Sequence, residues 1–178
     1  MRYKWFILSL IVVFTSCIND SGRTLGVGER LPHFSVTMHD GTQVSDVSLH
    51  GTPAVIVFFH TGCPDCQKEL PVIEQFYRQQ SAPARIVASD VKPAVNTEEA
   101  EPVAVVCISR AEAKESVQAY WSGHGFTMPY SAQPDRKVYE LFASTGIPRI
   151  YKINKEGIIV AAWDDILMPS LSDLSAIE

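Results

Sequence analysis

The chain has 178 residues, 46% of them hydrophobic, and a formal net charge of −5. This length is sufficient for one domain with a proper hydrophobic core. An acidic chain without a cluster of Lys and Arg is a poor candidate for binding nucleic acid or the headgroups of anionic lipids.

The first sixteen residues have the pattern of an export signal. Arg2 and Lys4 precede an apolar stretch, 5–14, that is too short to span a membrane. Small residues then precede Cys17, an order that resembles a bacterial lipoprotein signal, whereas an ordinary signal peptide or an uncleaved anchor would be the alternatives. We expect 1–16 to be removed and Cys17 to be lipidated, so that the exported protein is anchored in the cell envelope and faces the periplasm.

We expect residues 17–27 to form a tether and residues 28–178 to form one domain. In that domain, an alternating stretch at 34–38, the turn signal Asp40-Gly41 and a second stretch at 43–47 predict a β-hairpin. The almost wholly apolar run 54–59 predicts a central strand covered on both faces.

A helix is predicted after the central strand, with Pro71 inside it as the expected site of a kink. Residues 81–101, which contain prolines and several acidic residues, predict an inserted loop. The later expected elements are a strand at 103–108, helices at 111–121 and 137–143, strands at 149–154 and 158–163 joined by a turn, and a helix at 170–177. This order predicts a mixed α/β domain.

The segment Cys63-Pro64-Asp65-Cys66 lies at the turn from the central strand into the helix. Backbone N–H groups and the helix dipole stabilise a thiolate at such a turn, and the thiolate is the reactive form of cysteine. Pro64 suits the first helical turn, since its missing N–H would be unpaired there. Asp65 adds a negative charge, which should oppose the thiolate and make the reduced pair a better electron donor.

The cysteine count favours a reactive disulfide over a structural one. If Cys17 carries lipid, Cys63, Cys66 and one odd thiol, Cys107, remain in the folded part. Cys107 lies inside an apolar strand and is expected to be an inert buried thiol.

These motifs, in this order, resemble those of thioredoxin-fold proteins. More narrowly, the chain resembles the membrane-tethered thiol–disulfide oxidoreductases related to cytochrome-maturation reductases and the thiol-specific antioxidant superfamily. The resemblance covers roughly 27–163 and rests on the hairpin, the two spaced cysteines, Pro71, Gly146-Ile147-Pro148 and the turn at 154–157. It implies an α/β thioredoxin fold, with a central mixed β-sheet flanked by helices, an N-terminal β-hairpin and an inserted segment near 81–101.

The resemblance also implies roles for the matching positions. Cys63 would be the exposed nucleophile and Cys66 the buried resolving thiol. Glu69 matches a carboxylate that assists proton transfer, although a solvated helix carboxylate is an equal alternative at this spacing. Pro148 would follow a cis peptide bond, and the backbone of Ile147 would pair with an extended segment of the partner.

The chain departs from the family pattern in two places. Many relatives have a tryptophan before the first cysteine, whereas this chain has His60-Thr61-Gly62. His60 would either modulate the thiol or face solvent. Val57 stands near the position of the buried aspartate of thioredoxin itself, so thioredoxin's proton handling cannot be transferred to this chain.

Together these features predict a cell-envelope oxidoreductase that reduces disulfides of partner proteins and uses no cofactor. No metal is expected, because one CxxC lacks the second ligand pair of a zinc site. The expected partners are envelope thiol proteins such as an apocytochrome or a membrane reductase, and the protein is expected to be a monomer held at the membrane by lipid. The alternatives are a structural disulfide, a redox-inert partner-binding module, and a peroxiredoxin-like peroxidase, although the residues before Cys63 lack the peroxidase context.

Overall fold

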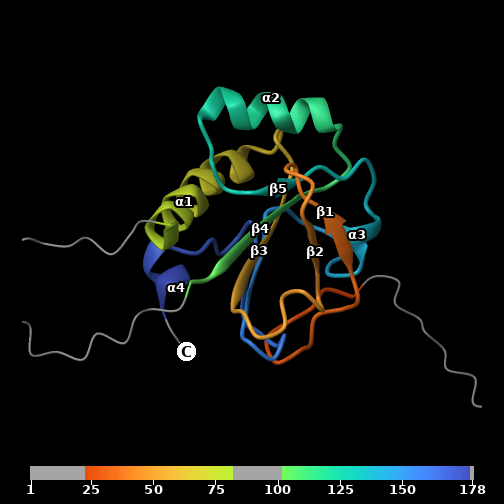
Figure 1. The fold of residues 1–178 in the computed structure, drawn as a ribbon, viewed down its shortest axis with the longest axis vertical. Helices are drawn as coiled ribbons and strands as arrows, with labels where there is room; N and C mark the ends of the chain where they lie inside the picture. Colours follow the sequence, from red (N-terminus) through yellow and green to blue (C-terminus); the bar gives the residue numbers. More distant parts are fainter. Residues whose placement is uncertain (1–22, 82–101, 177–178) are drawn as a thin grey trace, which may run out of the picture.

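The computed structural model describes residues 23–81 and 102–176, with the side chain of Ser81 left out (Figure 1). Its centre is a five-stranded mixed sheet with the strand order β5-β4-β3-β6-β7. The strands are β3 (Ala54–Phe59), β4 (Ala104–Ser109), β5 (Tyr130–Ser131), β6 (Arg149–Ile153) and β7 (Ile159–Trp163). Because β3 runs parallel to β4 and antiparallel to β6, the end of β3, the end of β4 and the start of β6 share one edge of the sheet.

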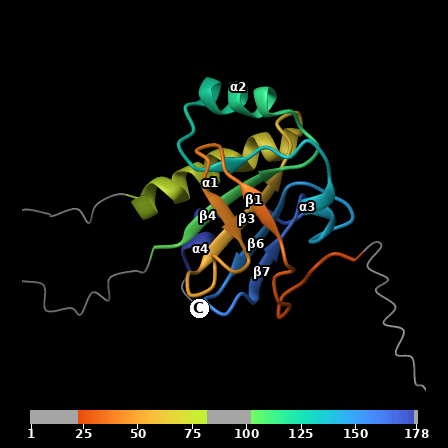
Figure 2. The ribbon, with the colours of Figure 1, turned by 45° about the vertical axis from the view of Figure 1, so that its right-hand side comes forward.

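Both faces of the sheet are covered, as expected for a central strand in which every side chain is apolar (Figures 1 and 2). One face packs against α1 (Pro64–Ser81), α2 (Lys114–His124) and α4 (Leu171–Ser175). The other face packs against α3 (Lys137–Glu140) and a separate antiparallel hairpin of β1 (Ser35–Thr37) and β2 (Gln43–Ser45). The six side chains of β3 are therefore buried from both sides.

Helix α1 carries the two neighbouring cysteines into the structure. Its apolar side chains Leu70, Ile73 and Phe76 are buried against β3 and β4. The helix continues through Pro71, and the expected kink at this residue stays a prediction. At the other end of the helix, the carbonyl of Cys63 accepts the N–H of Gln67 at 3.0 Å, which places Cys63 directly before the first helical residue.

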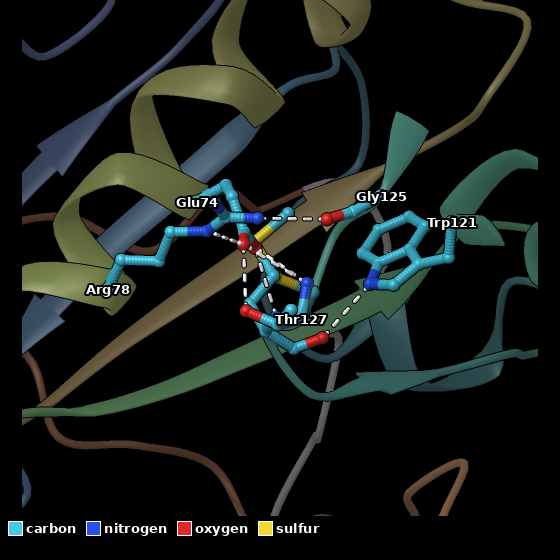
Figure 3. Close-up of polar contacts among 7 residues, drawn as sticks. Glu74, Arg78, Trp121, Gly125 and Thr127 are labelled. Carbon is cyan, nitrogen blue, oxygen red and sulfur yellow. Dashed lines mark hydrogen bonds and ion pairs between the residues drawn. The ribbon is translucent and has the colours of Figure 1, made fainter. Parts of the chain in front are cut away.

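A buried carboxylate fixes α1 to the chain that follows α2 (Figure 3). Glu74 accepts hydrogen bonds from the backbone N–H of Thr127 at 3.0 Å, from its hydroxyl at 2.8 Å, and from the N–H of Met128 at 3.0 Å. Arg78 donates to Glu74 and, at 2.9 Å, to the carbonyl of Gly125. The indole N–H of Trp121 donates to the Met128 carbonyl at 2.9 Å, so the loop is held from two helices.

The predicted elements are confirmed, with shifts at their ends, and one strand is new. β5 has only two residues and was not predicted. The helix expected at 111–121 begins three residues later, because Ala111 has φ of +55°, and it ends before Gly125, whose φ is +64°. The helix expected at 170–177 is shorter because Ser170 lies outside it as an N-cap that accepts the N–H of Asp173.

Several expectations concern residues outside the described ranges. The export signal 1–16, the lipidated Cys17, the first part of the tether and nearly all of the insertion 81–101 lie there. The described end of the expected tether, 23–27, lies against the domain, since the N–H of Leu25 donates to Phe142 at 2.8 Å and its side chain packs on the core. The expected bounds of the tether and of the domain stay predictions. Within the described ranges, no helix is long and apolar enough to cross a membrane.

Candidate active site

Cys63 and Cys66 lie where α1 begins, at the sheet edge formed by the end of β3 and the start of β6. Both are free thiols; Cys63 is partly exposed and Cys66 is fully buried. The Cys63 thiol donates to the carbonyl of Ile147 across the edge, with 3.6 Å between Sγ and the oxygen. The sequence therefore places one accessible and one inaccessible thiol side by side.

Burial raises the pKa of the Cys66 thiol well above its ordinary value. A hydrogen bond with Cys63 and repulsion from a Cys63 thiolate raise this pKa further. Cys66 is therefore protonated at neutral pH and needs a proton acceptor before it can act as a nucleophile.

Glu69, one helical turn after Cys66, is also buried: only 4% of its surface is exposed. Burial raises the pKa of Glu69 to about 7. Its Oε1 has no hydrogen-bond partner among the described residues. The solvated helix carboxylate, one of the two alternatives from the sequence, is therefore wrong. A carboxyl group with this pKa can both accept and release a proton at neutral pH.

The loop facing Cys63 contains a cis peptide bond between Ile147 and Pro148. The hydroxyl of Tyr139 in α3 donates to the carbonyl of Gly146 at 2.6 Å. Arg149 donates to the carbonyl of Thr145 at 3.2 Å, which closes the loop from its other end. The two anchors hold the Ile147 carbonyl in front of Cys63.

The turn that precedes Cys63 is held by a residue that sequence reasoning missed. The N–H and hydroxyl of Thr61 both donate to the carboxylate of Glu112, with 3.0 Å for the N–H bond. His60 accepts the N–H of Gly62 on Nδ1 at 3.0 Å, and its carbonyl accepts the N–H of Cys63 at 3.0 Å. The position of Glu112 along the chain was an indirect sign of its role. Glu112 follows β4, which runs parallel to β3, the strand that leads into Cys63, so the two segments lie at the same edge of the sheet.

The other residues of the motif lie at the start of α1. Pro64 is the first helical residue, as expected. The Asp65 carboxylate is bound by the Lys68 ammonium at 2.9 Å, and both groups are substantially exposed. The effect expected of Asp65 on the Cys63 thiolate stays a prediction.

Cys107 lies apart from this site, in β4. It is fully buried with its sulfur 3.7 Å from that of Met128, and burial raises the pKa of its thiol. These properties agree with the expected inert thiol. Within the described ranges, no group of three or more His, Cys, Asp or Glu side chains is placed to hold a metal ion.

The comparison with protein families decides the assignment, because the sequence pattern of the AhpC/TSA family matches residues 27–162. The chain belongs to the AhpC/TSA family. A curated relative, the thiol-disulfide oxidoreductase ResA of Bacillus subtilis, is 22% identical over 137 residues, which cover 77% of this chain and 66% of the relative. The matched part is thus slightly under two thirds of the length of ResA.

Solved structures agree with this family. A proposed protein disulfide isomerase from Bacteroides thetaiotaomicron has a TM-score of 0.68 at 28% identity, with 86% of this chain and 90% of that one covered. The thioredoxin domain of a thiol-disulfide oxidoreductase from Bacteroides vulgatus has a TM-score of 0.64 at 20% identity. The match covers 85% of this chain and 94% of that domain. The expected thioredoxin fold and oxidoreductase superfamily are confirmed.

Proposed function

We propose that this AhpC/TSA family member is a thiol–disulfide oxidoreductase that reduces disulfides of partner proteins with the Cys63–Cys66 pair. The observation that carries the proposal is the pairing of an accessible Cys63 with a buried Cys66 at the start of α1. The positive end of α1 favours a negative charge on Cys63, and the accessible sulfur is the one that a partner can reach.

The exchange would run in two steps that balance in electrons and protons. The Cys63 thiolate attacks one sulfur of the partner disulfide, and the other partner sulfur leaves as a thiolate. Cys66 then attacks Sγ of Cys63, which breaks the mixed disulfide and releases the second partner thiolate. The partner gains two electrons, its two thiolates take up through solvent the two protons that Cys63 and Cys66 gave up, and the Cys63–Cys66 disulfide is formed.

Glu69 is the proposed proton acceptor for Cys66. Residues three apart on a helix have their Cβ atoms about 5–6 Å apart, which brings the two side chains within reach. With its pKa raised to about 7 by burial, a substantial fraction of Glu69 is ionised at neutral pH and available as a base.

The cis-proline loop is the proposed binding site for the partner. The Ile147 carbonyl already accepts a hydrogen bond from the Cys63 thiol. An extended partner segment that paired with the Ile147 backbone beside Pro148 would bring its disulfide to Cys63 by strand addition.

The cellular setting is part of the same proposal. The charged and apolar pattern of 1–16 and the position of Cys17 support a lipid-anchored protein that faces the periplasm. Its partners would then be envelope thiol proteins, an apocytochrome or a membrane reductase, met by a monomer.

The test is reduction of a peptide that carries one intramolecular disulfide by the prereduced protein, followed by mass spectrometry. We expect the wild type and Cys107→Ala to reduce the peptide, Cys63→Ala to be inactive, and Cys66→Ala to retain the peptide on Cys63. Activity in Cys63→Ala would overturn the proposal, and so would an inactive wild type that still binds the peptide. Rapid turnover of hydrogen peroxide without peptide reduction would show a peroxidase instead.

A further inference from the structure

The imidazole of His60 occupies the space where a side chain at position 62 would stand. A Cβ added to Gly62 would lie 3.3 Å from Nδ1 and 3.4 Å from Cε1 of His60. The ring is kept there by the Gly62 N–H, which donates to Nδ1 at 3.0 Å. Because Nδ1 accepts this hydrogen bond, it carries a lone pair and the imidazole is neutral in this arrangement.

A second group competes for the same nitrogen. Oε1 of Glu112 lies 4.0 Å from Nδ1, and only 5% of the Glu112 side chain is exposed. If a solvent proton binds Nδ1, that atom becomes a donor and can no longer accept the Gly62 N–H. The buried carboxylate then becomes its partner, since it supplies both an acceptor and the opposite charge.

We propose that His60 and Glu112 are positioning residues for Cys63 that act through the turn 60–62. With a neutral imidazole, the turn is closed by the Gly62 hydrogen bond; with a protonated imidazole, His60 pairs with Glu112 and the Gly62 N–H is released. The role rests on the proposed thiol exchange, whereas the linkage between His60, Gly62 and Glu112 does not depend on it.

The turn is connected directly to the nucleophile. The N–H of Cys63 donates to the His60 carbonyl at 3.0 Å, and Thr61, between His60 and Gly62, is bound to Glu112. Release of the Gly62 N–H therefore loosens the backbone that holds the Cys63 thiol against the Ile147 carbonyl. In the neutral state, the two positioning residues fix both the residue before the nucleophile and the nucleophile's own N–H.

Other charged groups surround the site. Arg110, at the end of β4, acts electrostatically on Cys66, and the paired Asp65 and Lys68 lie on the first turn of α1. Among the described residues, Glu112 is the carboxylate that forms an ion-pair contact with the His60 ring, at 4.0 Å.

The test is a pH titration of the reduced, ¹⁵N-labelled full chain by NMR over about pH 5 to 8, where histidine side chains titrate. We expect the Gly62 amide proton to move upfield as the His60 ring protonates, with the same midpoint. His60→Asn offers an amide oxygen in the place of Nδ1 but cannot be protonated, so in this variant the Gly62 amide should not move over the same pH range. A Gly62 amide that does not follow His60 in the wild type, or that moves equally in His60→Asn, would overturn the proposal.

His124 is the control within the same molecule. Its Nδ1 lies 2.8 Å from the carbonyl of Tyr120 on α2, so its titration should leave the Gly62 amide unmoved. His124→Gln should therefore give the wild-type Gly62 curve. A Gly62 midpoint that disappears in His124→Gln would contradict the assignment to His60.

A kinetic readout tests the consequence for Cys63. His60→Asn offers its amide oxygen at the position of Nδ1 but cannot be protonated, so its turn should stay closed at every pH. The ratio of Cys63 alkylation rates by iodoacetamide, wild type over His60→Asn, should change by about three-fold or more at the low-pH end of the range, the scale of one hydrogen bond. A constant ratio would contradict the positioning role, whereas loss of peptide reduction by the wild type would contradict the proposed function.

Discussion

The Cys66 thiol and the Glu69 carboxyl lie one helical turn apart on α1, and both side chains are buried. Burial raises the pKa of both groups: that of Glu69 to about 7, and that of Cys66 well above the ordinary thiol value. At neutral pH, Glu69 is therefore partly ionised, whereas Cys66 keeps its proton. A transfer of the Cys66 proton to Glu69 is therefore the step in which the two groups depend on each other.

The first prediction concerns this transfer. Glu69→Gln keeps the size of the side chain but cannot accept the Cys66 proton, so resolution of the mixed disulfide should slow by about 100-fold, the scale of general base catalysis. The first attack, by Cys63, should change little. Stopped-flow mixing with a disulfide peptide and acid quenching would measure the two steps separately. Glu115→Gln, an exposed carboxylate on α2, is the control and should match the wild type.

The second prediction is that Glu69 makes the folded state less stable as pH rises. The pKa of Glu69 is higher in the folded state than its ordinary value of 4.5, so above this value the unfolded chain releases a proton that the folded protein retains. Stability should therefore fall between about pH 4.5 and 7 and then level off. Relative to the wild type, Glu69→Gln should gain about 3 kcal/mol between pH 4 and pH 8 in urea unfolding. A difference that does not vary with pH would contradict the buried carboxyl.

The third prediction has the opposite sign and concerns Glu74. Burial opposes its ionised form, but hydrogen bonds from Met128, Arg78 and Thr127 outweigh burial and hold its pKa below the ordinary value. This stabilisation is fully present above that ordinary value and is lost as pH falls through the lower folded pKa. Glu74→Gln should cost about 2 kcal/mol in urea unfolding at pH 7 and less in acid.

Glu140 provides the matched control for Glu74. Like Glu74, it pairs with an arginine four positions away on the chain, but more than half of its side chain is exposed. Exposed pairs contribute little, so Glu140→Gln should cost less than about 0.5 kcal/mol. An equal cost in the two variants would show that burial of Glu74 is not what stabilises the loop after α2.

The fourth prediction concerns the loop before Pro148. Gly146 has φ of +80°, and a Cβ there would lie 3.0 Å from Nη2 of Arg149. Gly146→Ala should therefore cost about 1–2 kcal/mol, the strain of a left-handed residue with a side chain. Gly123, inside α2, has nothing within 4 Å of its added Cβ, so Gly123→Ala should leave stability unchanged or raise it. In thermal unfolding, the Tm of Gly146→Ala should therefore fall, whereas that of Gly123→Ala should stay the same or rise.

The sequence predicted the parts of the site that carry a local signal. An apolar, β-rich run such as 54–59 favours a strand covered on both faces. The turn after it places Cys63 directly before the helix and Cys66 in the first helical turn. The cis bond before Pro148 was expected from the resemblance of Gly146-Ile147-Pro148 to the cis-proline loop of the family, and the structure has it.

The parts that were missed depend on contacts between distant segments. β5 has only two residues, too few to show the alternation of apolar and polar side chains that predicts a strand. It forms because Tyr130 pairs with Cys107. The burial of Glu69 could not be predicted from α1 alone. Its position in the helix, three residues after Cys66, fits both the buried face of α1 and the edge between that face and solvent. Glu112 becomes important only because the turn at Thr61 is brought to it by the parallel pairing of β3 and β4.

The location of a mixed disulfide tests the central claim most directly. Oxidised glutathione would be added to the native, reduced Cys63→Ala and Cys66→Ala proteins, and the modified cysteine identified by peptide mass spectrometry. We predict one glutathione on Cys63 in Cys66→Ala, none on Cys66 in Cys63→Ala, and a Cys63–Cys66 disulfide without adduct in the wild type. Modification of Cys66 at a rate similar to that of Cys63 would contradict the division into an attacking and a resolving thiol.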